Sequence, residues 1–157
     1  MNDITSKLGV EEQLEKDGII ASSTSGYSMY PMLYNRRDCV VIEKYRGNAG
    51  KYDVLLYRTP KGKLVLHRVV KSERMDEKLV IRGDNCPECE YVPEEWVIGK
   101  LVEFTRKNKN FKVTDKGYRF YSRLIVAVNP MVALKLRAMD AAVKMRKRLK
   151  KTSSSGK

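Results

Sequence analysis

The sequence is poor in the residues that form metal centres and in the long apolar runs that form membrane spans. Its 157 residues include one histidine, His67, and three cysteines. The longest uncharged run of the C-terminal part, residues 124–134, is shorter than the roughly 20 apolar residues of a membrane-spanning helix. Residues 1–20 are polar and acidic, which is not typical of a secretory signal peptide. We therefore expect a cytoplasmic protein with reduced thiols.

Acidic residues are scarce in the C-terminal part. The chain has a formal net charge of +13, and residues 100–157 contain 17 Lys or Arg but only 3 Asp or Glu. The first 99 residues are close to neutral. This distribution predicts a globular body with a basic segment, and it indicates a polyanionic partner: an anionic membrane surface, a nucleic acid or an acidic protein.

Strand-like runs rich in Val, Ile, Leu and Tyr dominate the first two thirds of the chain. Gly, Pro, Asn and Asp punctuate them, and residues 59–62 are typical of a hairpin turn. No helical pattern separates one run from the next, so we expect a largely antiparallel sheet. The sequence predicts a compact, mostly β domain over residues 19–113, with strand-like runs at 39–44, 53–58, 63–71, 78–83 and 96–106.

The segments on either side of this domain have helical patterns. Residues 3–17 predict a short amphipathic helix that ends at Gly18, within an N-terminal arm of residues 1–18. From Asp115 onward apolar residues recur at three- and four-residue steps, which predicts a basic helical tail over residues 114–151. Pro130 either starts a helix or kinks one. Residues 152–157 are expected to be a flexible end.

The basic tail has several interpretations. Its apolar stripe could pack on the body, or residues 129–151 could lie on an anionic membrane with Lys and Arg around an apolar face. The tail could also bind nucleic acid or a partner protein. We rank the membrane surface above nucleic acid.

Two of the three cysteines form a CxxC pair, Cys86 and Cys89. A zinc ribbon needs a second pair and only Cys39 remains, so we expect no metal site. A thioredoxin-like motif belongs to a βαβ setting, which this sequence lacks. A redox switch that moves the surrounding loop stays open, and two reduced loop cysteines are the favoured interpretation.

A candidate nucleophile, Ser28, lies in the stretch SGYSMYPML. A serine beside glycine usually belongs to a turn, so Ser28 alone does not indicate catalysis. A serine nucleophile needs a base, and the only histidine is His67. Strand alternation places His67 on the face opposite Leu64 and Leu66, where an ordinary, partly buried histidine would also fit.

The order of several short motifs is more specific than any one of them. They are Ser-Met-x-Pro at 28–31, Asp-Val-x-x-Tyr at 53–57, His-Arg-Val at 67–69, Gly-Asp-Asn at 83–85 and Val-Ile-Gly-Lys-Leu-Val at 97–102. Together they resemble the signal peptidase and LexA-type serine protease superfamily over residues 20–105. The histidine makes the chain most similar to the endoplasmic-reticulum and archaeal signal peptidases, although it lacks their transmembrane anchor.

The resemblance implies roles for the residues that match. Ser28, with Met29 and Pro31 in the same motif, corresponds to the nucleophile, and His67 corresponds to the general base. Asp84 matches the first acidic position of the histidine group, and Glu90 stands where that group has a second aspartate. The acid that supports His67 is therefore Asp84 or Glu90, and we favour Asp84.

One position departs from the signal peptidase pattern. Signal peptidases have a serine two residues before the nucleophile whose hydroxyl helps to bind the oxyanion, whereas this chain has Gly26, as in the LexA spacing. Gly26 permits a tight backbone path. The oxyanion would then be held by backbone amides, those of Tyr27 and Ser28.

The resemblance implies a serine endopeptidase that removes a leader, signal or propeptide by acyl transfer, without metal or cofactor. Its substrate would be an extended peptide, with small side chains near the cleaved bond, added along a sheet edge. The alternative is a weakly active or inactive peptide-binding regulator of the same fold. A LexA-like repressor is disfavoured, because the roughly 25 residues before Ser28 are too few for a helix-turn-helix unit and linker.

Overall fold

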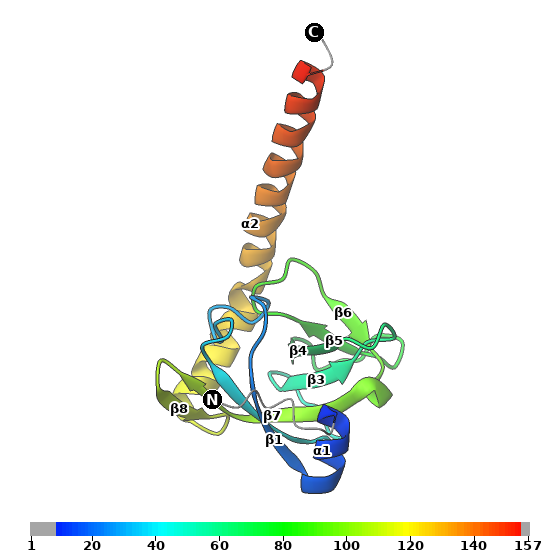
Figure 1. The fold of residues 1–157 in the computed structure, drawn as a ribbon, viewed down its shortest axis with the longest axis vertical. Helices are drawn as coiled ribbons and strands as arrows, with labels where there is room; N and C mark the ends of the chain where they lie inside the picture. Colours follow the sequence, from blue (N-terminus) through cyan, green and yellow to red (C-terminus); the bar gives the residue numbers. More distant parts are fainter. Residues whose placement is uncertain (1–8, 155–157) are drawn as a thin grey trace.

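The computed structural model describes residues 9–154, and it consists of one antiparallel sheet with two helices (Figure 1). The strand order is β1-β2-β7-β3-β4-β5-β6, and β8 pairs with β7. The prediction of a mostly β, largely antiparallel fold with a C-terminal helix is confirmed. The elements are α1 (Val10–Asp17), β1 (Ile19–Ser23), β2 (Cys39–Lys44), β3 (Val54–Arg58), β4 (Leu64–Val69), β5 (Leu79–Arg82), β6 (Glu90–Val92), the 3₁₀ turn η1 (Glu94–Trp96), β7 (Val97–Arg106), β8 (Lys109–Lys112) and α2 (Lys116–Ser154).

Helix α1 ends where the sequence predicts. Gly18 adopts the left-handed conformation with φ of 72°, and its N–H donates to the carbonyl of Leu14 at 3.0 Å. This cap favours glycine because a side chain is strained at positive φ. Leu14 is buried against the sheet. The predicted helix began at residue 3, and residues 3–8 lie outside the described residues.

The two faces of the sheet pack in two separate clusters. Along β3, Leu55 and Tyr57 belong to one cluster, while Val54 and Leu56 pack in the other. This alternation follows from the two-residue period of a strand. On β4, Val65 packs with the first cluster and Leu66 with the second. His67 therefore lies on the face opposite Leu66, as predicted.

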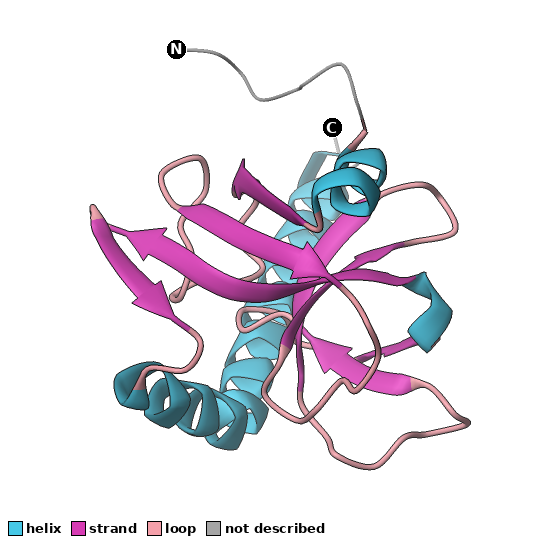
Figure 2. Cartoon of the chain, turned by 90° about the horizontal axis from the view of Figure 1, so that it is seen from below, coloured by secondary structure: helices cyan, strands magenta, loops and turns pink. Residues whose placement is uncertain are grey.

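Two strand edges are left open on one side of the molecule. Within residues 9–154, strand β1 pairs only with β2, so its other edge has no strand partner there. Strand β4 pairs with β5 only at Arg68 and Val69, which leaves residues 64–66 unpaired on that side. Figure 2 shows how strongly the strands twist around one another. Open edges of this kind offer backbone N–H and C=O groups to an added strand.

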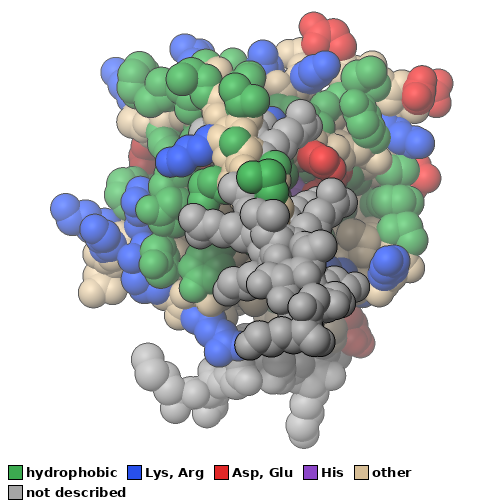
Figure 3. Space-filling view, turned by 90° about the horizontal axis from the view of Figure 1, so that it is seen from above, with side chains coloured by type: hydrophobic (Ala, Val, Ile, Leu, Met, Phe, Trp, Pro, Cys, Tyr) green, Lys and Arg blue, Asp and Glu red, His purple; other side chains and the backbone are tan. Residues whose placement is uncertain are grey.

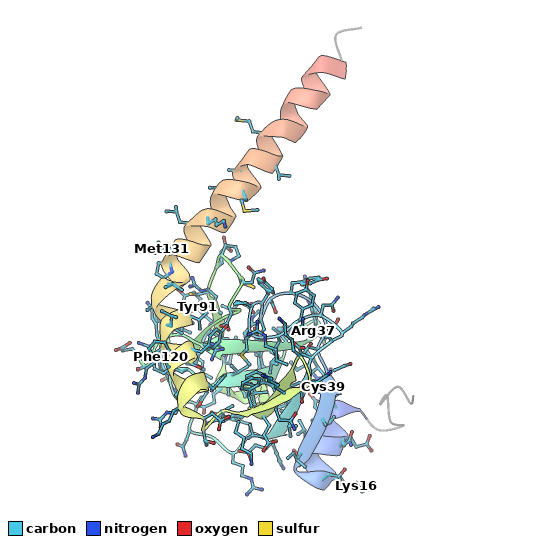
Figure 4. All side chains as sticks on the ribbon, turned by 90° about the vertical axis from the view of Figure 1, so that its left-hand side faces the viewer. Lys16, Arg37, Cys39, Tyr91, Phe120 and Met131 are labelled. Atoms are coloured by element: carbon cyan, nitrogen blue, oxygen red, sulfur yellow. The ribbon has the colours of Figure 1, made fainter. Side chains whose placement is uncertain are left out.

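Helix α2 is one long helix with Pro130 inside it. Its first turns pack on the body through buried Tyr118, Ser122 and Ile125, and its later part projects away from the sheet (Figure 1). Figure 4 shows the helix changing direction close to Met131. Pro130 thus kinks the helix and does not start it, because proline has no N–H and its ring crowds the preceding turn.

The C-terminal boundary differs from the sequence prediction. Residues 152–154, expected in a flexible end, belong to α2, and residues 155–157 lie outside the described part of the chain. Among the described residues, no helix combines the length and apolarity needed to cross a membrane.

Candidate active site

Ser28 lies in the loop that joins β1 to β2, and the side chains around it anchor that loop. Met29 and Leu33 are buried in the core, and the Leu33 N–H donates to the Met29 carbonyl at 2.9 Å. Gly26 has a φ of +90°, and its N–H donates to Asn35 Oδ1 at 2.9 Å. A side chain is strained at this φ, so the backbone path here favours glycine.

The remaining loop residues leave Ser28 half-buried. The Tyr30–Pro31 peptide bond is cis, and the Tyr30 N–H donates to the Tyr27 carbonyl at 3.1 Å. Buried Met29 thus follows Ser28 in a tight turn, and Ser28 faces the groove described below.

His67 is buried, with 5% of its surface exposed, and an acid holds one of its ring nitrogens. Nδ1 lies 3.0 Å from Glu90 Oε1, at the start of β6. The Tyr57 hydroxyl donates to Glu90 Oε2 at 2.6 Å and lies 3.3 Å from His67 Nδ1. Because a carboxylate only accepts, the neutral ring carries its proton on Nδ1 and leaves Nε2 free to take a proton.

Gly83 shows how close the Ser28 loop comes to His67. A Cβ atom at Gly83 would stand 3.0 Å from His67 Nε2, 2.7 Å from the Ser28 carbonyl oxygen and 2.6 Å from Cys86 Sγ. Any side chain at this position would push these groups apart. The glycine of the Gly-Asp-Asn motif therefore allows the Ser28 backbone and the His67 ring to approach the same point.

Asn85 holds the same loop from the other side. Its backbone N–H donates to the Ser28 carbonyl at 2.8 Å, and its side-chain amide donates to the Tyr27 carbonyl at 3.3 Å. The sequence analysis did not assign Gly83 or Asn85 a role, although both belong to the quoted motif. Their contacts fix the position of Ser28 relative to the turn after β5.

Ser28, His67, Cys86 and Glu90 all line one groove of about 880 Å³. The groove runs between the open edge of β1 and the β3–β4 hairpin, over an apolar floor that includes Ile20, Ile42 and Leu66. In Figure 3 a small part of the histidine is visible beside an acidic side chain. The structure therefore brings three of the four predicted catalytic residues, Ser28, His67 and Glu90, into one groove.

Asp84 does not partner His67, which corrects the preferred assignment. Both of its carboxylate oxygens accept hydrogen bonds from Arg68, from Nε and from an Nη, each at 2.8 Å. Arg68 and Asp84 are 0% and 1% exposed, so this is a buried, bidentate ion pair. Burial lowers the pKa of Arg68, but the Asp84 hydrogen bonds and charge outweigh that effect and raise it. Glu90 is the acid beside His67.

The ion pair also ties the site to α2. The second Nη of Arg68 donates to Ser122 Oγ at 3.0 Å and to the Tyr118 hydroxyl at 3.1 Å, and the Tyr121 hydroxyl donates to Asp84 at 3.1 Å. The sequence analysis missed these residues. Arg68 stood in the quoted His-Arg-Val motif, but a sequence motif does not show which carboxylate its arginine meets.

Burial and Glu90 act in opposite directions on His67. Burial lowers the pKa of His67, while the Glu90 charge and hydrogen bond raise it, and the net shift is downward. His67 is therefore neutral at neutral pH. The Ser28 hydroxyl makes no hydrogen bond within the described residues, and such bonds commonly tighten only when substrate is bound.

Two backbone donors beside Ser28 are open. Within the described part of the chain, the N–H groups of Tyr27 and Ser28 donate no hydrogen bond. Unpaired N–H groups next to a nucleophile are the usual components of an oxyanion site. This arrangement agrees with the backbone oxyanion site expected from the sequence.

All three cysteines carry free thiols. Burial and the nearby Glu90 charge raise the pKa of Cys86, so its thiol is mostly protonated at neutral pH. Within residues 9–154, no group of three or more His, Cys, Asp or Glu side chains is arranged to hold a metal ion.

Comparisons with known proteins identify no relative. No protein-family model matches the chain, no curated protein matches it, and no solved structure matches its fold. The function of this chain is therefore inferred from the geometry of the site and from the motifs of the sequence.

The titration of His67 tests the electrostatics of the site directly. Because His67 is the only histidine, its imidazole signals are unambiguous in ¹⁵N–¹H NMR spectra. We expect a pKa below the usual value of about 6.5 and a neutral tautomer protonated at Nδ1. Glu90→Gln removes a charge that favours the imidazolium, so it should lower the pKa further. An unchanged pKa of His67 in Glu90→Gln would contradict the pairing.

The Arg68–Asp84 pair has a measurable effect on stability. Removing one partner, as in Asp84→Ala, leaves an uncompensated buried charge and should cost about 3–5 kcal/mol of the free energy of unfolding in urea. The double variant Arg68→Met/Asp84→Ala should cost less than the sum of the two single variants. Additive costs, or a loss below about 1 kcal/mol for Asp84→Ala, would show that the pair is not coupled.

Proposed function

We propose that this protein is a serine endopeptidase in which Ser28 is the nucleophile, His67 the general base and Glu90 the acid that orients His67. The observation that carries the proposal is the arrangement around His67. Its Nδ1 is held by Glu90, and its free Nε2 faces the backbone of the Ser28 loop across Gly83. A serine nucleophile requires a neutral, oriented base of this kind.

The reaction is acyl transfer in two halves. Ser28 Oγ attacks the peptide carbonyl while His67 Nε2 takes its proton, and the Tyr27 and Ser28 amides donate to the oxyanion. His67 then gives the proton to the leaving amine, which breaks the peptide bond and leaves an acyl-enzyme. Water, deprotonated by His67, releases the acid product and restores Ser28.

The open edges of β1 and β4 support an extended peptide as substrate. Both edges border the groove, and both lead along the chain toward the site, β1 to the Ser28 loop and β4 to His67. A peptide strand between them would pair with unpaired backbone groups on one or both sides. The resemblance of the motifs to signal peptidases favours a leader or propeptide of a precursor protein as the natural substrate.

A second function, a peptide-binding regulator without catalysis, has two observations in its favour. The Ser28 hydroxyl has no hydrogen-bond partner among the described residues, and Gly26 supplies no hydroxyl for the oxyanion. The two functions share the same groove and differ only in turnover.

Substitution of the two central residues distinguishes these functions. Ser28→Ala and His67→Ala should each lower kcat/KM on a cleaved peptide by at least about 10³-fold, since they remove the nucleophile and its base. Circular dichroism and urea unfolding would show that both variants remain folded. Full activity in either variant would refute the assignment, whereas peptide binding by the wild-type protein without cleavage would favour the regulator.

We also propose that α2 holds the protein on an anionic membrane surface, on the cytoplasmic side. Beyond Pro130 the helix exposes apolar side chains spread over about half of its circumference at 100° per residue. The sequence of residues 116–154 contains 11 Lys or Arg and one acidic residue, Asp140. A wide apolar arc beside many cations is typical of a helix that lies on a membrane surface. Binding to the phosphates of a nucleic acid would need the cations but not the apolar arc. The exposed residues are Met131 (73%), Leu134 (72%), Met145 (64%), Met139 (54%) and Val143 (51%).

Vesicle co-sedimentation tests this surface. We expect binding to phosphatidylcholine vesicles that contain phosphatidylglycerol, weak binding to phosphatidylcholine alone, and loss of binding at high salt. Met131→Ser/Leu134→Ser should weaken binding without changing stability, because both side chains are exposed, and Lys109→Gln on β8 serves as control. Equal binding by the Met131/Leu134 variant, or binding to DNA but not to vesicles, would contradict the proposal.

A further inference from the structure

Among the described residues, two lysine side chains line the groove without forming an ion pair. Its charged lining residues, apart from His67, are Lys61, Lys63 and Glu90. Glu90 is occupied by His67 and Tyr57. The ammonium groups of Lys61 and Lys63 have no acidic partner among the described residues.

A well-ordered hairpin holds the two lysines. The Gly62 N–H donates to the Thr59 carbonyl at 2.8 Å, the Thr59 N–H donates to the Lys63 carbonyl at 2.9 Å, and Gly62 has a φ of +76°. Arg58, on the same hairpin, donates to the Gly62 carbonyl at 2.9 Å and pairs with Glu11 of α1. Within the described part of the chain, the neighbouring arginine therefore has an acidic partner and the two lysines have none.

Lys63 directly precedes β4, which begins at Leu64, and it lines the same groove as His67. The charge of Lys63 lowers the pKa of His67. The opposite wall of the groove, which includes Ser22, Ser23 and Ser25, has no formal charge. Positive charge is thus confined to the hairpin side of the groove.

We propose that this hairpin selects peptides with an aspartate or glutamate near the cleaved bond, so that the carboxylate pairs with Lys61 or Lys63. The proposal rests on the peptidase function and names its substrate class. Lys63 lies four positions before His67, and a bound peptide has a rise per residue similar to that of the strand beside it, about 3.3 Å. The acidic residue would therefore lie about three to five residues from the cleaved bond.

A matched peptide series tests the charge preference. A neutral peptide that the wild-type protein cleaves receives Glu, Gln or Lys at each of the five positions on either side of its cleaved bond. We expect one cluster of positions at which Glu raises kcat/KM about two- to fivefold over Gln, as suits an exposed ion pair, with the gain lost at high salt. Equal rates for the Glu and Gln peptides at every position would overturn the proposal.

Charge reversal assigns the effect to the hairpin. In Lys61→Glu/Lys63→Glu the preference should change from the Glu to the Lys peptide, with each rate compared with that of the neutral parent peptide in the same variant. Lys109→Glu, an exposed change on β8 outside the groove, should keep the wild-type preference. A Glu preference that survives the double reversal would place the selecting charge elsewhere and refute the proposal.

A binding assay keeps this proposal separate from the proposed catalysis. Fluorescein-labelled peptides with Glu, Gln or Lys at each scanned position are titrated with Ser28→Ala protein, and anisotropy reports the Kd. Failure of the wild-type protein to cleave any peptide would refute the peptidase function. In that case tighter binding of a Glu peptide than of its Gln counterpart would still support the acidic selection, and equal binding would refute it.

Discussion

The buried ion pair between Arg68 and Asp84 is the interaction on which the rest of the structure depends. Arg68 uses its guanidinium to join strand β4, the turn after β5 and the first turns of α2, through Asp84, Ser122 and Tyr118. It also donates to Met32 Sδ at 3.0 Å in the loop that follows Ser28. A charge buried this deeply must be matched, since an unpaired one costs several kcal/mol. The pair therefore restricts the chain to one arrangement of these four segments.

This constraint explains the composition of the site. Because Arg68 engages both oxygens of Asp84, His67 takes its acid from the next available carboxylate, Glu90, and Tyr57 supplies the proton that satisfies the other Glu90 oxygen. Burial and the hydrogen bond to Glu90 raise the pKa of Tyr57, so its hydroxyl stays protonated and remains a donor. Asp84 thus acts on the chemistry indirectly, by fixing the turn whose Gly83 and Asn85 hold the Ser28 loop.

Much of the fold follows from local patterns in the sequence, but the partners of the polar groups do not. Alternation predicted the longer strands and the face of His67, and Gly18 predicted the end of α1. Strands β1, β6 and β8 were not predicted. Strand β6 has only three residues, and β8 has charged residues at both ends, so neither has a clear alternating pattern. The choice between Asp84 and Glu90 depends on how the chain turns over residues 83–90, which is a tertiary property. Pro130 could not be assigned to a start or a kink because both are allowed by its missing N–H.

The central claim is that His67 activates Ser28, and covalent labelling tests it most directly. A fluorophosphonate reacts with an activated serine and adds a fixed mass, which intact-protein mass spectrometry detects and peptide mapping locates. The account predicts one adduct per chain, on Ser28, that is lost in His67→Ala and strongly slowed in Glu90→Gln. Labelling of Ser28 at the same rate in wild-type and His67→Ala protein, or no labelling of Ser28 at all, would contradict it.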